Sequence, residues 1–201
     1  MIRTALIALP LAVAGLLGAT AVPAQAATPQ PAPLTCQGQG VDPAAKIRYR
    51  TEAVIEAPLS TIWKLQTKVE RWSAWQAPVT SIRRLDHRPL RKGSQFRWTT
   101  PAPATPSTPA TTLSITSTVQ QLRHQSCLRW TGPAVGEGLR IDNGTHVWNF
   151  TKVRDGVLVR TEETWTGAQV EADPALATQM LGYGLEAWLA DLKKAAESRG
   201  C

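Results

Sequence analysis

The residues of this sequence best suited to chemistry are one histidine and one glutamate, His146 and Glu163. They fall in two strand-like runs on either side of the dipeptide Asp155-Gly156, which is among the strongest signals for a β-hairpin. Because side chains alternate between the faces of a strand, both residues fall on one face of the hairpin. Burial raises the pKa of a glutamate, and an adjacent imidazole can share its proton. Such a pair suits general acid–base steps.

A turn centred on Asp155-Gly156 also predicts the register of the hairpin. In this register the opposing pairs are Arg154 and Val157, Phe150 and Thr161, Trp148 and Glu163, and His146 and Trp165. The histidine and the glutamate are then diagonal neighbours, with backbones roughly 7–8 Å apart. The inward face carries His146, Trp148, Phe150, Val159, Thr161, Glu163 and Trp165. The other face carries Asn149, Thr151, Arg160, Glu162 and Thr164, with Val147 and Leu158, and we expect it to be the wetter side.

Aromatic residues are expected to surround this pair. The chain has 8 tryptophans, and each buried indole N–H needs a partner, so they are not expected to fill a solid core completely. The residues predicted to line a ligand cavity are Phe96, Trp98, Trp130, Trp148, Phe150 and Trp165, with His146, Glu163, Tyr183 and Arg140 near the polar end of the ligand. The alternative is that the aromatic residues fill the core and that His146 and Glu163 hydrogen-bond to each other.

The remaining pattern predicts the elements that position these residues. A strand is expected over residues 47–57, and then a helix that begins at Pro58 and ends near Trp75. Further strands are expected at 79–85, 94–99, 113–122, 128–131 and 139–141, with an extended Pro/Thr/Ala loop at 101–109. A long helix follows, with Asp173 as N-cap and Gly200 as its stop. This order indicates an α+β fold in which a curved antiparallel sheet wraps around the long C-terminal helix.

The beginning of the chain has the pattern of an export signal. A basic start, an apolar run from Ala5 to Val22 and a small-residue site predict a signal peptide over residues 1–26, cut after Ala26. Residues 27–45 are rich in Pro, Gln, Thr and Gly and are expected to form a disordered spacer. Residues 46–199 are then the folded domain. The predicted location is periplasmic or secreted.

Three cysteines remain after processing, at positions 36, 127 and 201. In an oxidising compartment one pair can form a bridge. Cys36 and Cys201, which lie at opposite ends of the chain, either form a bridge that ties the termini or stay unpaired. Cys127 precedes a strand and is expected to be a small buried apolar residue. The cysteine spacing matches no metal pattern, and we expect neither a metal nor a cofactor.

The charge balance is basic but modest. Processing would leave 21 basic and 15 acidic side chains, a net charge of +6. Part of it lies in residues 83–92, where Arg83, Arg84, Arg91 and Lys92 are expected either to be a solvated loop or to contact an anionic membrane surface. No nucleic-acid motif is present, so we expect no nucleic-acid partner.

Residues 47–198 resemble the START-like superfamily, called SRPBCC, and within it the polyketide cyclase/dehydrase-type proteins. The matching segments are residues 53–63, 72–75, 89–98, 146–150, 156–167 and 184–192. This resemblance implies a helix-grip fold with a hydrophobic cavity for lipids, sterols, polyketides or other apolar molecules. The signal peptide and the tract at 101–109 depart from the family pattern and argue against a cytoplasmic biosynthetic role.

Three functions therefore remain open at this level. The first is an exported binding protein that holds a hydrophobic small molecule or lipid in the aromatic-lined cavity. The second is a cyclase- or dehydratase-type enzyme in which His146 and Glu163 are the acid–base pair. An interaction protein that uses the basic loop is a third interpretation.

Overall fold

The computed structural model describes residues 32–198, so the predicted signal peptide, Cys201 and the helix stop at Gly200 lie outside the described residues. From Pro33 the chain forms one unit with the predicted α+β fold. Its elements are β1 (Ile47–Ile55), α1 (Leu59–Thr67), the 3-10 helix η1 (Val69–Ala74), β2 (Ser81–Arg84), β3 (Gln95–Ala102), β4 (Thr111–Arg123), β5 (Cys127–Gly136), β6 (Leu139–Val153), β7 (Gly156–Thr166), the 3-10 helix η2 (Val170–Ala172) and α2 (Pro174–Glu197).

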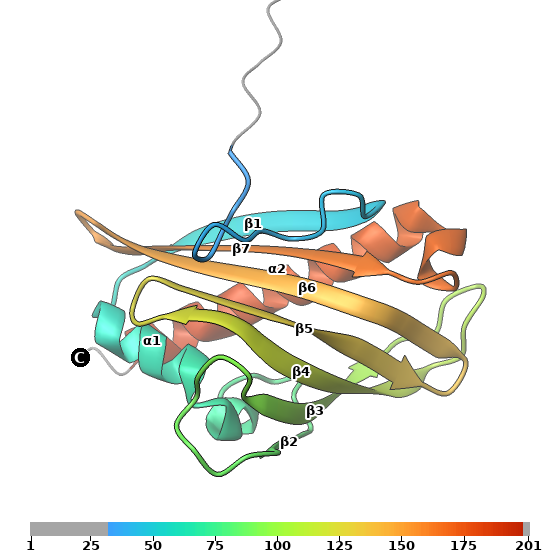
Figure 1. The fold of residues 1–201 in the computed structure, drawn as a ribbon, viewed down its shortest axis with the longest axis horizontal. Coiled ribbons are helices and arrows are strands. Elements are labelled where there is room, and N and C mark those ends of the chain that lie inside the picture. Colours follow the sequence, from blue (N-terminus) through green and yellow to red (C-terminus); the bar gives the residue numbers. More distant parts are fainter. Residues whose placement is uncertain (1–31, 199–201) are drawn as a thin grey trace, which may run out of the picture. The chain divides into compact units, whose positions relative to one another are not determined.

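The seven strands form one antiparallel sheet in the order β1-β7-β6-β5-β4-β3-β2. The sheet is curved, and α2 crosses its inner face, as Figure 1 shows. The segment with α1 and η1 links β1 at one edge to β2 at the other. The predicted helix-grip arrangement is therefore confirmed. No helix within residues 32–198 is long and apolar enough to cross a membrane.

Helix α2 begins as its sequence predicts. The side chain of Asp173 accepts a hydrogen bond from the backbone N–H of Leu176 at 3.0 Å, and Pro174 is the first helical residue. Gly182, inside the helix, is explained by a close approach to the sheet. A Cβ atom at this position would lie 2.8 Å from the ring of Tyr49 on β1. The small residue therefore lets α2 lie directly against the first strand.

The predicted helix over residues 58–75 is divided in the structure. The α-helical part ends at Thr67, and a 3-10 helix follows from Val69. The apolar stripe expected on this segment is buried as a whole, with Ile62, Leu65, Val69 and Trp72 all in the main hydrophobic cluster. The indole N–H of Trp72 donates to the backbone oxygen of Gln66 at 3.1 Å, which holds the two helical segments together.

The hairpin of β6 and β7 has the predicted faces but a different register. Val153 pairs with Gly156, so the loop is Arg154-Asp155 and not Asp155-Gly156. Gly156 is needed for another reason: it has a φ of 137°, and a Cβ atom there would lie 2.2 Å from the backbone oxygen of Ile55 on β1. The shift is two residues, so every side chain keeps its face.

Residues 33–45 are not the expected disordered spacer. They lie on the outer face of the sheet, where Leu34 and Val41 form a small apolar cluster with Val147 of β6. The backbone N–H of Leu34 donates to Glu162 at 3.0 Å, and the guanidinium of Arg129 donates to the backbone oxygen of Gly40 at 2.8 Å. The low apolar content of this segment was outweighed by these specific contacts.

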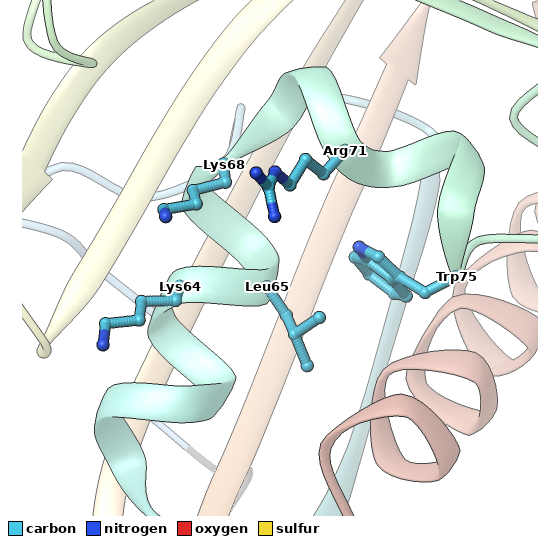
Figure 2. Close-up of a pocket in the computed structure, with 5 residues that line it drawn as sticks. All are labelled: Lys64, Leu65, Lys68, Arg71 and Trp75. Carbon is cyan, nitrogen blue, oxygen red and sulfur yellow. The ribbon is translucent and has the colours of Figure 1, made fainter. Parts of the chain in front are cut away.

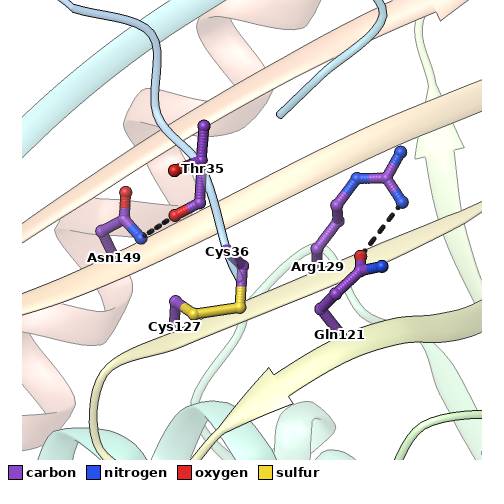
Figure 3. Close-up of a disulfide and its surroundings, with 6 residues drawn as sticks. All are labelled: Thr35, Cys36, Gln121, Cys127, Arg129 and Asn149. Atoms are coloured by element: carbon purple, nitrogen blue, oxygen red, sulfur yellow. Dashed lines mark hydrogen bonds between the residues drawn. A yellow bond between two sulfur atoms is a disulfide. The ribbon is translucent and has the colours of Figure 1, made fainter. Parts of the chain in front are cut away.

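A disulfide between Cys36 and Cys127 joins this segment to β5 (Figure 3). The expectation for Cys127, a free apolar residue, is therefore wrong, and Cys36 does not pair with Cys201. The side chain of Asn149 on β6 donates to the backbone oxygen of Thr35 at 2.9 Å, beside the disulfide. We call residues 33–45 the N-terminal strap.

The strap buries part of the outer face of the sheet, which the sequence analysis expected to be exposed to solvent. Val147, Glu162 and Thr164 are buried on this face. Glu162 keeps a charged partner, because Arg48 of β1 contacts its carboxylate. The buried carboxylate is therefore both ion-paired and hydrogen-bonded, as a charge in this position needs to be.

The disulfide is expected to make a large contribution to stability. It closes a loop with a sequence separation of 91 residues, for which chain entropy predicts about 4.6 kcal/mol. Replacing Cys36 and Cys127 together by serine should lower the free energy of unfolding by about this amount in urea titrations. Cys201→Ser is the control and should leave the free energy of unfolding unchanged. Peptide mapping that found Cys36 joined to Cys201 would contradict the pairing.

Candidate functional site

His146 and Glu163 lie directly opposite each other on β6 and β7. His146 Nδ1 and Glu163 Oε2 are 3.0 Å apart, so the two side chains form a direct pair and not the expected diagonal one. The other nitrogen of the ring, Nε2, lies 2.6 Å from the hydroxyl of Thr161. Trp165 donates its indole N–H to Glu163 Oε1 at 2.9 Å. One hairpin therefore supplies every hydrogen bond of the pair.

Burial shifts the two pKa values in opposite directions. It lowers the pKa of His146 from its ordinary 6.5 to about 3, because the imidazolium form would lose its hydration. It raises the pKa of Glu163 from 4.5 to about 7, although the indole N–H of Trp165 works against this shift. Between these values the pair carries one proton and no net charge.

The hydrogen bonds fix where this proton lies. The hydroxyl of Thr161 donates to the backbone oxygen of Val147 at 3.3 Å, so its oxygen is free to accept from Nε2–H of His146. A neutral imidazole with a proton on Nε2 has an unprotonated Nδ1. The protonated carboxyl of Glu163 therefore donates to Nδ1. The result is a continuous chain of hydrogen bonds from Glu163 to the backbone of β6.

Aromatic rings fill the interior on one side of this pair. Trp72 and Trp188 have ring centroids 4.9 Å apart, and His146 lies 4.9 Å from both Trp130 and Trp148. Other rings in this group contact at similar distances, namely Trp63 with Phe150, Trp72 with Phe96, and Trp98 with Trp188. We call these residues the aromatic half of the interior. Here the second expectation from the sequence, a filled core with a hydrogen-bonded pair, describes what is observed.

A second hydrophobic cluster occupies the other side, and we call it the aliphatic half. Its buried members are Ile47, Leu113, Ala134, Ile141, Val170, Ala177, Leu181 and Leu185. Trp165 and Ile115 pack against this cluster and remain partly exposed. Glu163 stands between the halves, because it contacts His146 on the aromatic side and Trp165 on the aliphatic side. Its side chain is 17% exposed, against 4% for His146.

Two hollows of the described residues lie away from this pair. One, of about 370 Å³, is bordered by the start of α1 and the tip of the hairpin, including Pro58, Lys152 and Arg154. The other, of about 110 Å³, is bordered by Lys64, Leu65, Lys68, Arg71 and Trp75 (Figure 2). Neither borders Trp148, where the sequence analysis expected a hollow. The neighbouring rings contact Trp148 there instead.

The structure brings together most of the predicted site residues. Phe96, Trp98, Trp130, His146, Trp148, Phe150, Glu163 and Trp165 all belong to the inner side of the sheet. Tyr183 does not: it is 58% exposed and its hydroxyl accepts a hydrogen bond from Gln179 on the same helix. Arg140 is also exposed, and it pairs with Asp142.

Sequence reasoning missed three residues of the interior. Thr161 was placed on the correct face but not recognised as the partner of His146. Trp188 was placed on the apolar face of the last helix, yet it contacts Trp98, Trp130 and Trp148 directly. Buried Gln66 accepts the indole N–H of Trp188 at 3.2 Å, and no pattern in the sequence indicates this contact.

Two buried donors in the aromatic half have no hydrogen-bond partner among the described residues, Trp148 Nε1 and Gln66 Nε2. Both can donate to an acceptor atom. Within residues 32–198 there is no group of three His, Cys, Asp or Glu side chains that could hold a metal ion.

Comparison with known proteins finds one family whose model matches most of this chain. A family model described as polyketide cyclase / dehydrase and lipid transport matches residues 46–197. Comparison with curated protein sequences gives no significant match.

Solved structures share the fold at low identity. The protein TTHA0849 from Thermus thermophilus is 16% identical over 77% of this chain and 99% of its own, with a TM-score of 0.60. A START superfamily protein from Mycobacterium smegmatis is 10% identical over 76% of this chain and 98% of its own, with a TM-score of 0.59. The di-domain ARO/CYC StfQ from the steffimycin biosynthetic pathway is 16% identical over 76% of this chain and 51% of its own, with a TM-score of 0.57.

The pair predicts a specific dependence of stability on pH. Folded Glu163 holds its proton up to about pH 7, whereas the unfolded chain releases it near 4.5. Its contribution to the free energy of unfolding therefore falls with rising pH between these values, by about 1.4 kcal/mol per pH unit. His146 acts in the opposite sense: its contribution is lost as pH falls from 6.5 toward 3. Between pH 4.5 and 6.5 the two effects cancel.

Glu163→Gln should remove the first effect alone. Urea unfolding at several pH values should then show that the variant gains stability relative to the native protein as pH rises from 4.5 to 7. Glu52→Gln, which removes an exposed carboxylate from β1, is the matched control and should follow the native curve. Parallel curves for Glu163→Gln and the native protein would show that Glu163 is ionised throughout this range.

Proposed function

The chain belongs to the polyketide cyclase / dehydrase and lipid transport family, and we propose that it binds a hydrophobic small molecule between the inner face of its sheet and α2. The observation that carries this proposal is the uncharged pair of His146 and Glu163. It lies at the boundary between the aromatic and aliphatic halves, and Glu163 remains partly exposed there. Apolar walls with one placed polar group are the usual composition of such a site.

We place the ligand in the aliphatic half of the interior. The aromatic half is occupied by rings in mutual contact, so a ligand there would have to displace them. In the aliphatic half, Leu181 and Leu185 of α2 face β-strand residues, and the neighbouring Ile115 and Trp165 are incompletely covered. A ligand seated here would cover the exposed apolar surface of Ile115 and Trp165 and gain the corresponding hydrophobic free energy.

The polar end of the ligand would meet Glu163. Its Oε2 is engaged with His146, and its Oε1 accepts only the indole N–H of Trp165. A carboxyl oxygen can accept a second hydrogen bond. A hydroxyl group on the ligand is the donor that fits this atom. We therefore propose an apolar molecule with a hydroxyl group at one end.

A cyclase- or dehydratase-type reaction is the second candidate, and the pKa of Glu163 favours it. A carboxyl with a pKa of about 7 is poised to give or take a proton near neutral pH. His146 lies within hydrogen-bond distance and orients the carboxyl of Glu163 through Nδ1. In this mechanism Glu163 protonates the leaving hydroxyl of the substrate, which departs as water. The resulting carboxylate then takes the proton from the adjacent carbon as the double bond forms, so the pair ends in its starting state.

We also propose that the protein is exported and that its mature chain begins at Ala27. The disulfide between Cys36 and Cys127 supports this proposal, because such bonds persist in oxidising compartments. The strap that carries Cys36 begins at residue 33, and residues 27–32 separate it from the predicted leader. A small basic protein in that compartment could also contact anionic membrane surfaces through its exposed cations.

Ligand binding can be tested with two variants and a control. Protein purified under native conditions should release an apolar molecule into organic solvent, identified by mass spectrometry. Ala177→Phe, which inserts a ring into the aliphatic half, should reduce the amount recovered by about tenfold or more, at a stability cost of about 1–3 kcal/mol. Ala168→Phe, at an exposed position just before η2, is the control and should retain the ligand. Equal recovery from Ala177→Phe and the native protein would contradict the proposed position.

Glu163→Gln separates binding from catalysis. If the protein only binds, this variant should retain the ligand with an affinity reduced by roughly tenfold or less, as expected for one hydrogen bond. If the protein is an enzyme, the variant should bind the molecule identified above but fail to convert it. Conversion by Glu163→Gln at the native rate would exclude the acid–base role.

Export has its own test. Expression of the full chain with its natural start, followed by fractionation, should yield a mature protein outside the cytoplasm. Its intact mass should correspond to a first residue at Ala27. A protein that stays in the cytoplasm with residues 1–26 attached would contradict the export proposal.

A further inference from the structure

A small hollow with a strongly basic border lies where α1 passes into η1. Lys64, Leu65, Lys68, Arg71 and Trp75 border its volume of about 110 Å³. Three of these five side chains are cationic and none is acidic. The spacing explains the cluster, because residues three and four apart lie on one side of a helical segment. Figure 2 shows Arg71 and Trp75 facing the same space, whereas the ammonium ends of Lys64 and Lys68 extend away from Trp75 on the other side of α1.

The three cations lack acidic partners. Among residues 32–198, no ion pair involves Lys64, Lys68 or Arg71. Nearby Arg84 shows the contrast, because Glu70 and Asp86 both pair with it. Like charges placed three and four residues apart repel each other. The fold therefore gathers positive charge here without neutralising it.

A neutral donor at the same hollow points to the kind of ligand. The indole nitrogen of Trp75 is buried and has no hydrogen-bond partner among the described residues. In Figure 2 it lies on the side of the ring that faces Arg71. Leu65, which is buried, adds an apolar wall, and charge interactions are stronger beside such a surface than in open water. An unpaired N–H and the unpaired guanidinium of Arg71 at one space, with two more unpaired cations bordering it, favour an anion with several acceptor oxygens.

We propose that this hollow binds a phosphate group, as a free ion or as the head group of a lipid. Its volume is well below the roughly 300 Å³ at the lower limit of drug-sized pockets, so it fits a charged group and not a whole lipid. The guanidinium of Arg71 can hold two phosphate oxygens, and the two lysines act as point charges. The indole N–H of Trp75 donates to a further oxygen. This site is separate from the interior between the sheet and α2.

The basic run at residues 83–92 is a weaker place for such a group. Arg84, near its start, has a side chain that is only 9% exposed and is held by carboxylates and by Ser94. Its charge is therefore already compensated. The hollow beside Trp75 has the uncompensated charge and the free donor together.

Calorimetric titration with inorganic phosphate tests the proposal, with sodium chloride used to hold the ionic strength constant. The double variant Lys68→Gln with Arg71→Gln should bind phosphate at least tenfold more weakly than the native protein. The double variant Arg88→Gln with Lys92→Gln loses the same charge from an exposed loop and should stay within twofold of native. Trp75→Phe keeps a ring but removes the N–H, and should weaken binding several-fold.

Vesicles distinguish the two sources of the phosphate group. The native protein and both double variants are mixed with phosphatidylcholine vesicles, with and without phosphatidic acid, and sedimented. Retention that needs phosphatidic acid and is lost only in the Lys68/Arg71 variant identifies a lipid head group. Calorimetric binding without such retention identifies free phosphate. Binding in neither assay, or an equal loss in both double variants, overturns the proposed site.

Discussion

The interior of this protein depends on one proton shared between His146 and Glu163, because this proton leaves the buried pair without net charge. An ionised carboxylate or imidazolium among tryptophan rings would lose its hydration at a cost of several kcal/mol. Joined by one proton, the two side chains enter the interior with no net charge. Thr161 and Trp165 complete the hydrogen bonds, so both nitrogens of the imidazole and both oxygens of the carboxyl are engaged. The polar centre of the fold is thus satisfied within a single hairpin.

This pair divides the interior into two parts with different physical character. The aromatic half is held by rings at near-perpendicular angles, such as Trp72 against Phe96 and Trp188, an arrangement that favours rigid packing. The aliphatic half consists mainly of Leu, Ile, Val and Ala side chains and leaves part of Trp165 uncovered. At 10–16% identity the likeness to the solved structures shows a shared fold alone. The ligand preference proposed for this chain therefore depends on its own residues.

The sequence was sufficient for features that depend on local periodicity. The α+β class, the long last helix with its Asp173 cap, and the faces of the hairpin all follow from repeats of two or about 3.6 residues. The hairpin register did not follow, because Gly156 serves the contact with Ile55 and not the turn. Tyr183 was misplaced for a similar reason: its neighbours Gly182 and Leu185 face the sheet, and it points away from the sheet.

The predicted features that failed on the outer face depend on contacts distant in sequence. Nothing local to residues 33–45 indicates that Leu34 reaches Glu162 or that Cys36 lies against Cys127. Their composition resembles that of unstructured segments, and only the finished sheet provides the surface on which they lie. The same holds for the basic hollow, because the burial of the indole nitrogen of Trp75 becomes visible only when η1 is packed.

The strap has a consequence for the order of assembly. Its covalent attachment to β5 needs an oxidant, which the cytoplasm does not ordinarily supply. A chain still inside the cell would hold the strap by Leu34, Val41 and a few hydrogen bonds alone. For an exported protein, passage across the membrane would then be the event that locks the outer layer in place. Delivery and final maturation would be coupled through one pair of sulfur atoms.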